Sequence, residues 1–144
     1  MKKYFAEGLG TFALTLAVGL SLSGTFPVST PALAAIVVGL FVYLVGAISG
    51  AHFNPAITIG AWSIGKISPK DALLYIVSQV IGVALALFVV SRHAQMPVLT
   101  VDGSFNVGLA EALGAFFLAF AIASVIYGKT VDRLSGAVIG FALF

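Results

Sequence analysis

Residues 49–65 have the sequence SGAHFNPAITIGAWSIG, and this stretch decides the fold. Within it, Asn54-Pro55 opens an apolar segment, residues 54–65, that ends just before Lys66. Asn is a preferred helix cap and Pro suits the first helical turn, so the pair predicts a helix start. A helix of this length rises about 18 Å, little more than half of a hydrocarbon core about 30 Å thick. The segment is therefore too short to cross a membrane.

The rest of the chain is apolar enough to require a membrane. Of its 144 residues, 60% are hydrophobic and 8% are charged, whereas a soluble domain has roughly a quarter charged residues. We predict spans at 4–24, 32–49, 71–91 and 107–127, and a fifth that starts near 133 and continues to Phe144. Capped prolines also mark two further helix starts, at Thr30-Pro31 and Ser68-Pro69.

The short segment lies between two full spans, so we expect it to enter and leave the membrane on one side. With a cytoplasmic N-terminus, six of the seven Lys and Arg residues lie inside, as membrane proteins prefer. A true span at 54–65 would instead move two of the six outside. Irregular backbone at membrane depth is tolerated only where it is buried in protein or lines a watery cavity, so residues 49–53 are candidates for a pore lining. The six inner residues are Lys2, Lys3, Lys66, Lys70, Lys129 and Arg133, and the outer one is Arg92.

The chain contains an internal repeat. Residues 6–17, AEGLGTFALTLA, match residues 110–121, AEALGAFFLAFA, at seven of twelve positions. Three spans separate the two copies, and an odd number means that the second copy is inverted in the membrane. We therefore divide the chain into a first repeat, residues 1–106, with three spans and the half-helix 54–65, and the start of the inverted second repeat, residues 107–144.

Glu7 and Glu111 occupy the same position in the two copies, each inside an apolar span. A carboxylate within a membrane is costly and by default indicates function. We expect both to be buried and to accept hydrogen bonds from unwound loop backbone; the alternative places Glu7 at the membrane interface. Gln79, in the third span, either steadies a loop or bonds a neighbouring helix.

Other chemistry is poorly supported. The chain has no cysteine, and His52 and His93 lack acidic partners at ligand spacing, so we expect no metal site and no cofactor. The sequence does not bring an acid, a base and a nucleophile together, so we expect no catalytic residues and no enzyme. The basic residues lie at span ends, which indicates membrane topology and not nucleic-acid binding.

The half-helix has an electrostatic consequence. Its N-terminus carries about half a positive charge and points into the bilayer centre. If the Asn54 oxygen caps the helix, the Asn54 NH2 group remains free to donate into a cavity. The upstream carbonyl groups, from Gly50 to Phe53, form a row of acceptors. Such an arrangement suits hydrogen-bonding neutral solutes and repels cations.

These motifs resemble those of the major intrinsic protein family, the aquaporins and aquaglyceroporins. Residues 49–58, SGAHFNPAIT, resemble the family's first signature loop, and Ala6 to Thr11 and Ser78 to Gly82 are similar to other family motifs. The resemblance covers the N-terminal part of the family fold. It implies an all-α membrane protein, an aquaporin-like right-handed helical bundle with inverted repeats and a re-entrant half-helix, incomplete at the C-terminus. The half-helix effect is already part of the general account of aquaporin selectivity.

The resemblance also implies roles for particular residues. His52 would line the cytoplasmic vestibule, and Glu7 and Glu111 would brace the two signature loops. Ala34 is the candidate selectivity-filter residue, at a position where the family often has an aromatic side chain. The implied pore lining consists of Gly50, Ala51, His52, Phe53, Asn54, Pro55 and Ala56.

We expect a passive channel for water or small neutral solutes such as glycerol, with proton and cation exclusion at the Asn-Pro-Ala loop. The alternative is a non-conducting scaffold or assembly partner that keeps the fold without a complete pore. The second Asn-Pro-Ala, the filter arginine and the sixth span of the family are absent from residues 1–144, which indicates a fragment or, alternatively, a natural short form. The family implies a multi-pass protein of the lipid bilayer (the plasma membrane, if bacterial or archaeal) and a homotetramer when complete.

Overall fold

The structure is a computed structural model that describes residues 1–24, 27–93 and 103–143. The described residues form helices and no β-strand, and four of the helices are long and apolar enough to cross a membrane. The expected all-α membrane fold is therefore confirmed. In chain order the elements are α1 (Lys2–Leu22), α2 (Thr30–Ser49), α3 (Pro55–Ser63), α4 (Pro69–His93), α5 (Phe105–Ile126), the 3-10 helix η1 (Asp132–Leu134) and α6 (Ser135–Phe141).

The four long helices α1, α2, α4 and α5 match the predicted spans to within two residues at each end. One predicted cap is wrong. Ser29, and not Thr30, precedes the first residue of α2, and the Thr30 hydroxyl instead accepts a hydrogen bond from Ser21 Oγ at 2.9 Å. The predicted fifth span consists of η1 and α6 within the described residues, and Phe144 lies outside them.

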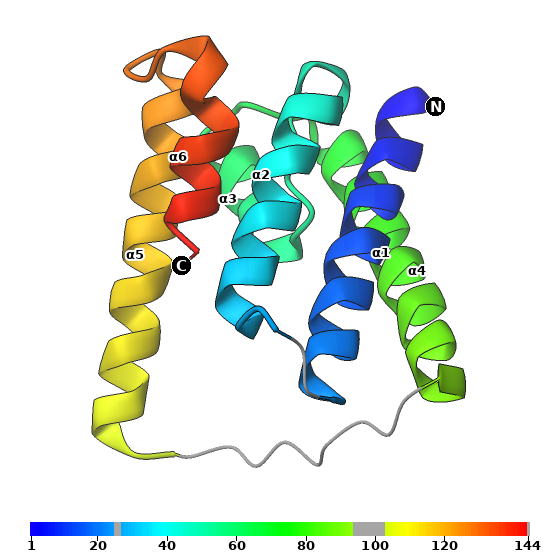
Figure 1. Cartoon of the computed structure of the whole chain (residues 1–144). Coiled ribbons are helices and arrows are strands. Elements are labelled where there is room, and N and C mark those ends of the chain that lie inside the picture. The colour runs from blue at the N-terminus through cyan, green and yellow to red at the C-terminus, as the bar shows by residue number, and fades with distance from the viewer. Residues whose placement is uncertain (25–26, 94–102, 144) are drawn as a thin grey trace.

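Helix α3 is the half-length element. It has nine residues and rises about 14 Å, so it is shorter than the predicted segment 54–65. The helix ends early because Gly65 turns the chain with a φ of 71° and the Lys66 N–H donates to the Ala61 carbonyl at 2.8 Å. The chain descends from the end of α2 into the bundle, and α3 returns to the same end (Figure 1).

The start of α3 lies near the middle of the bundle. Gln79 is the tenth residue after Pro69, the first residue of α4. Its side chain bonds Thr58 on α3 and Glu7, the residue that also binds the loop before α3. Ten helical residues rise about 15 Å, half of a hydrocarbon core about 30 Å thick. The structure therefore has the re-entrant geometry that the sequence predicts.

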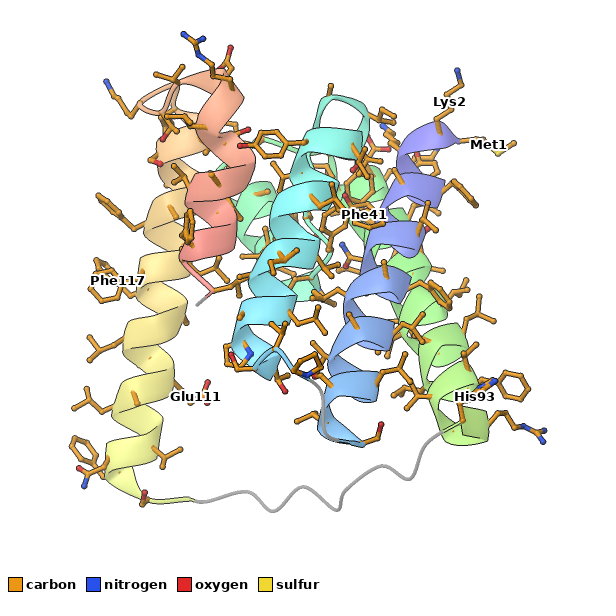
Figure 2. The ribbon with its side chains drawn as sticks, in the orientation of Figure 1. Met1, Lys2, Phe41, His93, Glu111 and Phe117 are labelled. Carbon is orange, nitrogen blue, oxygen red and sulfur yellow. The ribbon has the colours of Figure 1, made fainter. Side chains whose placement is uncertain are left out.

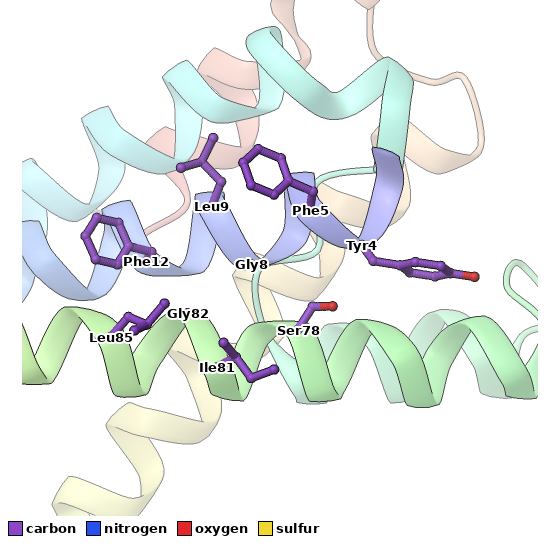
Figure 3. A pocket seen from close by; sticks show the side chains of 9 residues that line it. All are labelled: Tyr4, Phe5, Gly8, Leu9, Phe12, Ser78, Ile81, Gly82 and Leu85. Atoms are coloured by element: carbon purple, nitrogen blue, oxygen red, sulfur yellow. The ribbon is translucent and has the colours of Figure 1, made fainter. Parts of the chain in front are cut away.

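Glycines allow the closest helix contacts. Where α1 crosses α4, a Cβ atom on Gly82 would collide with the Gly8 carbonyl oxygen. The same crossing forms one wall of an open apolar groove of about 340 Å³ (Figure 3). Where α2 meets α6, Cβ atoms on Gly136 and Gly140 would collide with the backbone of α2. Small residues at such crossings let helices pack through dispersion contacts in lipid, where there is no hydrophobic driving force.

One ion pair and one cation–π contact join helix ends at the same end of the bundle. Lys3 pairs with Asp71 at 2.8 Å, which joins the starts of α1 and α4. The Lys66 ammonium lies 4.9 Å from the ring centre of Tyr127, which joins the ends of α3 and α5. Figure 2 shows Lys2 at this end and His93 at the other.

Helix α5 runs antiparallel to α1 (Figure 1), as an inverted repeat requires. It is also the least buried of the long helices, with Ala121 its single buried residue. The division into residues 1–106 and 107–144 stays a prediction.

Candidate functional site

Glu7 is the centre of the site, fully buried in the second turn of α1. Its Oε1 accepts the His52 N–H at 3.0 Å, and its Oε2 accepts the Phe53 N–H at 2.7 Å. Oε2 also accepts a hydrogen bond from Gln79 Nε2 at 2.8 Å. One carboxylate thus satisfies two loop amides and an amide side chain of α4, and buried backbone N–H groups need such a partner.

The loop conformation explains why those two amides need an acceptor. Gly50, Ala51 and Phe53 have φ values of 86°, 53° and 50°. Ala51 and Phe53 are not glycines, so each left-handed backbone conformation costs on the order of 1–3 kcal/mol and persists only when its surroundings hold it. The loop backbone turns the His52 and Phe53 N–H groups towards Glu7. The carboxylate therefore stabilises a strained conformation.

A second group of contacts joins α4 to α3. Gln79 Nε2 also donates to Thr58 Oγ1 at 3.1 Å, and both side chains are fully buried. The Thr58 hydroxyl in turn donates to the Asn54 carbonyl at 3.0 Å and lies 3.2 Å from His52 Nδ1. Gln79 thus bonds the neighbouring helix α1 and also the half-helix α3, while its role in steadying the loop stays a prediction.

Asn54 begins α3. Its Oδ1 accepts the Ala56 N–H at 2.7 Å, while no described residue bonds its NH2 group. The side chains of Asn54, Pro55 and Ala56 are exposed. The structure therefore presents a free amide donor at the N-terminus of a helix that starts at mid-depth.

The carbonyl groups of residues 50–53 accept no hydrogen bond from any described residue. Gly50 is exposed, and Ala51 and His52 are half-buried. Phe53 differs, because its side chain is buried against Gly10 and the Phe41 ring, with the two ring centres 6.0 Å apart. Phe53 can thus line a cavity only through its backbone.

Glu111 is not placed like Glu7. It is exposed and lines an open cavity of about 510 Å³ beside α5, on the side of that helix opposite Phe117 (Figure 2). The expectation that Glu111 is buried is wrong for this structure, because no described loop lies against that face of α5. Its predicted role as a brace stays a prediction.

Ala34 is half-buried, one helical turn before Val38. Residues four apart share a helix face, and Val38 is buried with Val42 and Ile139 in a small apolar core. Ala34 therefore lies on the inner face of α2. The role of Ala34 in a filter stays a prediction.

Sequence reasoning missed two buried residues of the site, Thr58 and Tyr75. The Tyr75 hydroxyl donates to the Ser49 carbonyl at 2.7 Å. Helical spacing offered a signal, since Tyr75 lies four residues before Gln79 and so on the same face of α4. Thr58 lies four residues after Asn54, within reach of the Asn54 carbonyl.

The described residues hold no group of three His, Cys, Asp or Glu side chains suited to a metal ion. What they hold is a capped half-helix, braced at mid-depth inside a bundle of membrane-length helices. This architecture is that of an integral, multi-pass membrane protein. The chain belongs to the major intrinsic protein family, because the family's sequence model, described as "Major intrinsic protein", matches residues 1–144.

Curated relatives support the same assignment. The chain is 37% identical to aquaporin Z of Photorhabdus laumondii over 88% of its own length and 60% of that protein. It is 38% identical to a probable NIP-type aquaporin of Nicotiana alata, over 99% of the chain and 56% of the relative. Aquaporin AqpM of Methanothermobacter thermautotrophicus is 32% identical, over 71% of the chain and 46% of the relative. The chain thus spans about half the length of the curated relatives that it matches.

Proposed function

We propose that this chain forms the first half of a passive transmembrane pore for water or small neutral solutes such as glycerol. The pore-lining strip consists of Gly50, Ala51, His52, Phe53, Asn54, Pro55 and Ala56. The observation that carries the proposal is Asn54, whose oxygen caps α3 while its NH2 group remains free at mid-depth. The family membership and the aquaporin names of the relatives support the same function.

The proposed mechanism needs no reacting group. A solute oxygen accepts a hydrogen bond from the Asn54 NH2 group, and solute hydroxyl groups donate to the free carbonyls of residues 50–53. The N-terminus of α3 carries about half a positive charge, so a cation or a hydrated proton is repelled at the same point. A second half-helix from the inverted repeat, braced by Glu111, would supply the opposite wall, and Ala34 would contribute to the outer constriction.

The proposal includes an orientation. The end of the bundle with the start of α1 is cytoplasmic, because it holds six of the seven basic residues of the chain. The solute enters the strip from that side, past His52. The complete pore assembles as a homotetramer in the plasma membrane.

A chimera tests this function. Residues 1–144 are joined to the remaining C-terminal part of the Photorhabdus laumondii aquaporin Z and reconstituted in liposomes. Stopped-flow light scattering is expected to show water permeability well above that of empty vesicles. A chimera that folds and inserts but conducts nothing would support the non-conducting scaffold instead.

Asn54→Asp in this chimera tests the donor itself. A carboxylate keeps the cap but places a negative charge where α3 carries its positive end, so proton leak is expected to rise roughly tenfold, as a dipole effect of about 1–2 kcal/mol implies. A pH-sensitive dye inside the vesicles measures the leak. Asn106→Asp, an exposed Asn on α5, is the matched control and should leave the leak unchanged. Equal leaks in wild type and Asn54→Asp contradict the role of Asn54.

A further inference from the structure

Tyr75 joins α4 to Ser49, the last residue of α2 and the one before the re-entrant loop. Its hydroxyl donates to the Ser49 carbonyl at 2.7 Å, and its ring packs edge-on against His52 with the ring centres 5.3 Å apart. The side chain is 3% exposed, although tyrosine carries a polar group. Such a hydroxyl is buried only where it has a partner, and here the partner is the last residue of α2.

We propose that Tyr75 is a positioning residue, which sets where the row of free carbonyl groups begins and how the His52 ring is directed. The proposal rests on the proposed pore. The last carbonyl groups of a helix have no partner within it. Tyr75 takes the Ser49 carbonyl, so the free carbonyl groups of the loop begin at Gly50, where the chain turns with a φ of 86°.

Ser49 is held from two sides. Tyr75 binds its carbonyl, and its own hydroxyl oxygen accepts the Ala51 N–H at 3.1 Å. Ser49 is itself buried. The start of the left-handed loop is therefore attached to α4 as well as to α2, and it cannot move away from α4 without breaking the bond to Tyr75.

Tyr75 is in turn supported from the cytoplasmic end proposed above. The Tyr4 ring packs edge-on against it at 6.0 Å, and the Tyr4 hydroxyl donates to Asp71 at 2.7 Å. Asp71 also pairs with Lys3. These contacts leave the Tyr75 ring little room to rotate, so its hydroxyl is already directed at Ser49.

The His52 ring has two neighbours that orient it, Tyr75 on one side and Thr58 Oγ1 at 3.2 Å from Nδ1. In the proposed pore this ring narrows the cytoplasmic entrance. Loss of the Tyr75 hydroxyl loosens Ser49 and the turn that follows it, so the His52 ring gains freedom and the entrance widens. A wider entrance favours a larger solute over water.

The first test uses the 144-residue chain in lipid nanodiscs and does not depend on conduction. In Tyr75→Phe, the His52 ring-nitrogen NMR signals are expected to shift, and the Ala51 and His52 amides should exchange about tenfold faster. Tyr43→Phe is the matched control. It loses bonds of the same kind, to the Arg133 carbonyl and the Ala137 N–H, where α2 meets η1 and α6. Neither bond involves residues 49–53, so both readouts should stay at wild-type values.

The second test measures selectivity in the chimera. Tyr75→Phe is expected to raise the ratio of glycerol to water permeability roughly fivefold, the factor that corresponds to about 1 kcal/mol, while Tyr43→Phe leaves the ratio unchanged. An unchanged ratio in a conducting chimera overturns the proposal, as do unshifted His52 signals in the 144-residue chain. If the wild-type chimera does not conduct while the His52 signals shift, the pore function fails and the positioning of the loop by Tyr75 stands.

A measurement without substitution covers the case that Tyr75→Phe fails to fold. In the wild-type chain the Tyr75 hydroxyl proton is expected to exchange slowly enough to give its own NMR signal, because it is buried and bonded to Ser49. A rapidly exchanging Tyr75 hydroxyl overturns the proposal.

Discussion

Glu7 shows at the scale of one residue how a charged group is held inside an apolar bundle. Its two oxygens accept three hydrogen bonds, from His52, Phe53 and Gln79, and the side chain has no exposed surface. A buried charge is tolerated when it is hydrogen-bonded in this way. In return, the carboxylate gives the loop amides the partner that lipid does not supply.

Glu7→Ala is expected to lower the free energy of unfolding by about 2–6 kcal/mol, because two buried N–H groups lose their acceptor at about 1–3 kcal/mol each. Glu7→Gln should cost less, since one acceptor oxygen remains. Denaturant unfolding in detergent micelles measures both. Glu111→Ala is the matched control, at the same repeat position but exposed, and should change stability by less than about 0.5 kcal/mol. Similar losses for Glu7→Ala and Glu111→Ala contradict the bracing role.

At the scale of elements, helix crossings place the groups that hold the loop. Glu7 lies on α1 and Gln79 on α4, and they meet because α1 and α4 approach closely at Gly8 and Gly82. Figure 3 shows both glycines at this crossing, between the larger side chains that line the groove. A wider crossing would separate Gln79 from Glu7, and Thr58 on α3 would lose its connection through Gln79 to α1.

Gly82→Ala is expected to destabilise the protein by about 1–3 kcal/mol, the usual cost of overpacking, because the new Cβ atom meets the Gly8 carbonyl oxygen. Gly114→Ala on α5 is the control. A Cβ atom added there would have no neighbouring atom of the described residues within 4 Å, so improved helix propensity should stabilise the protein by up to about 1 kcal/mol. Unfolding in mixed micelles measures both variants. If Gly82→Ala left the stability unchanged, the helices would be able to separate without cost.

At the scale of the whole molecule, the re-entrant half-helix decides the topology. The chain has no cysteine, so single cysteines at Lys2, Ser63 and His93 can be labelled one at a time. A membrane-impermeant maleimide added outside intact cells is expected to label His93→Cys alone, because the proposed topology puts positions 2 and 63 on the cytoplasmic side. Labelling of Ser63→Cys from outside, with Lys2→Cys protected, would show that α3 crosses the membrane.

The 144-residue chain by itself is not expected to conduct water. A closed pore needs two half-helices that meet at mid-depth from opposite sides, and residues 1–24, 27–93 and 103–143 hold one. Two copies supply both only if one inserts upside down, which six basic residues at one end oppose. Osmotic swelling of liposomes that contain residues 1–144 measures the permeability. Values above those of empty vesicles, abolished by Asn54→Asp, would reveal a working half-channel.

Much of this architecture follows from local sequence features. Apolar stretches of about 20 residues predict membrane helices because lipid forces each segment to satisfy its own backbone groups. Asn54-Pro55 predicts the start of α3 because capping depends on neighbours in the chain. The cap of α2 and the end of α3 each lie one or two residues from their predicted positions, since both depend on turn geometry at Ser29 and Gly65.

The sequence by itself therefore determined the membrane environment, the helices, the half-helix and its polar cap, because each depends on composition or on residues close in the chain. Only the tertiary structure decided which groups hold the loop. Glu7 reaches Phe53 across 46 positions and Gln79 across 72, and Tyr75 reaches Ser49 across 26. These bonds depend on two left-handed residues that are not glycine, Ala51 and Phe53, and on helix crossings, which no local pattern encodes. For the same reason Glu7 and Glu111, identical in the repeat, differ in burial: burial depends on what packs against a helix.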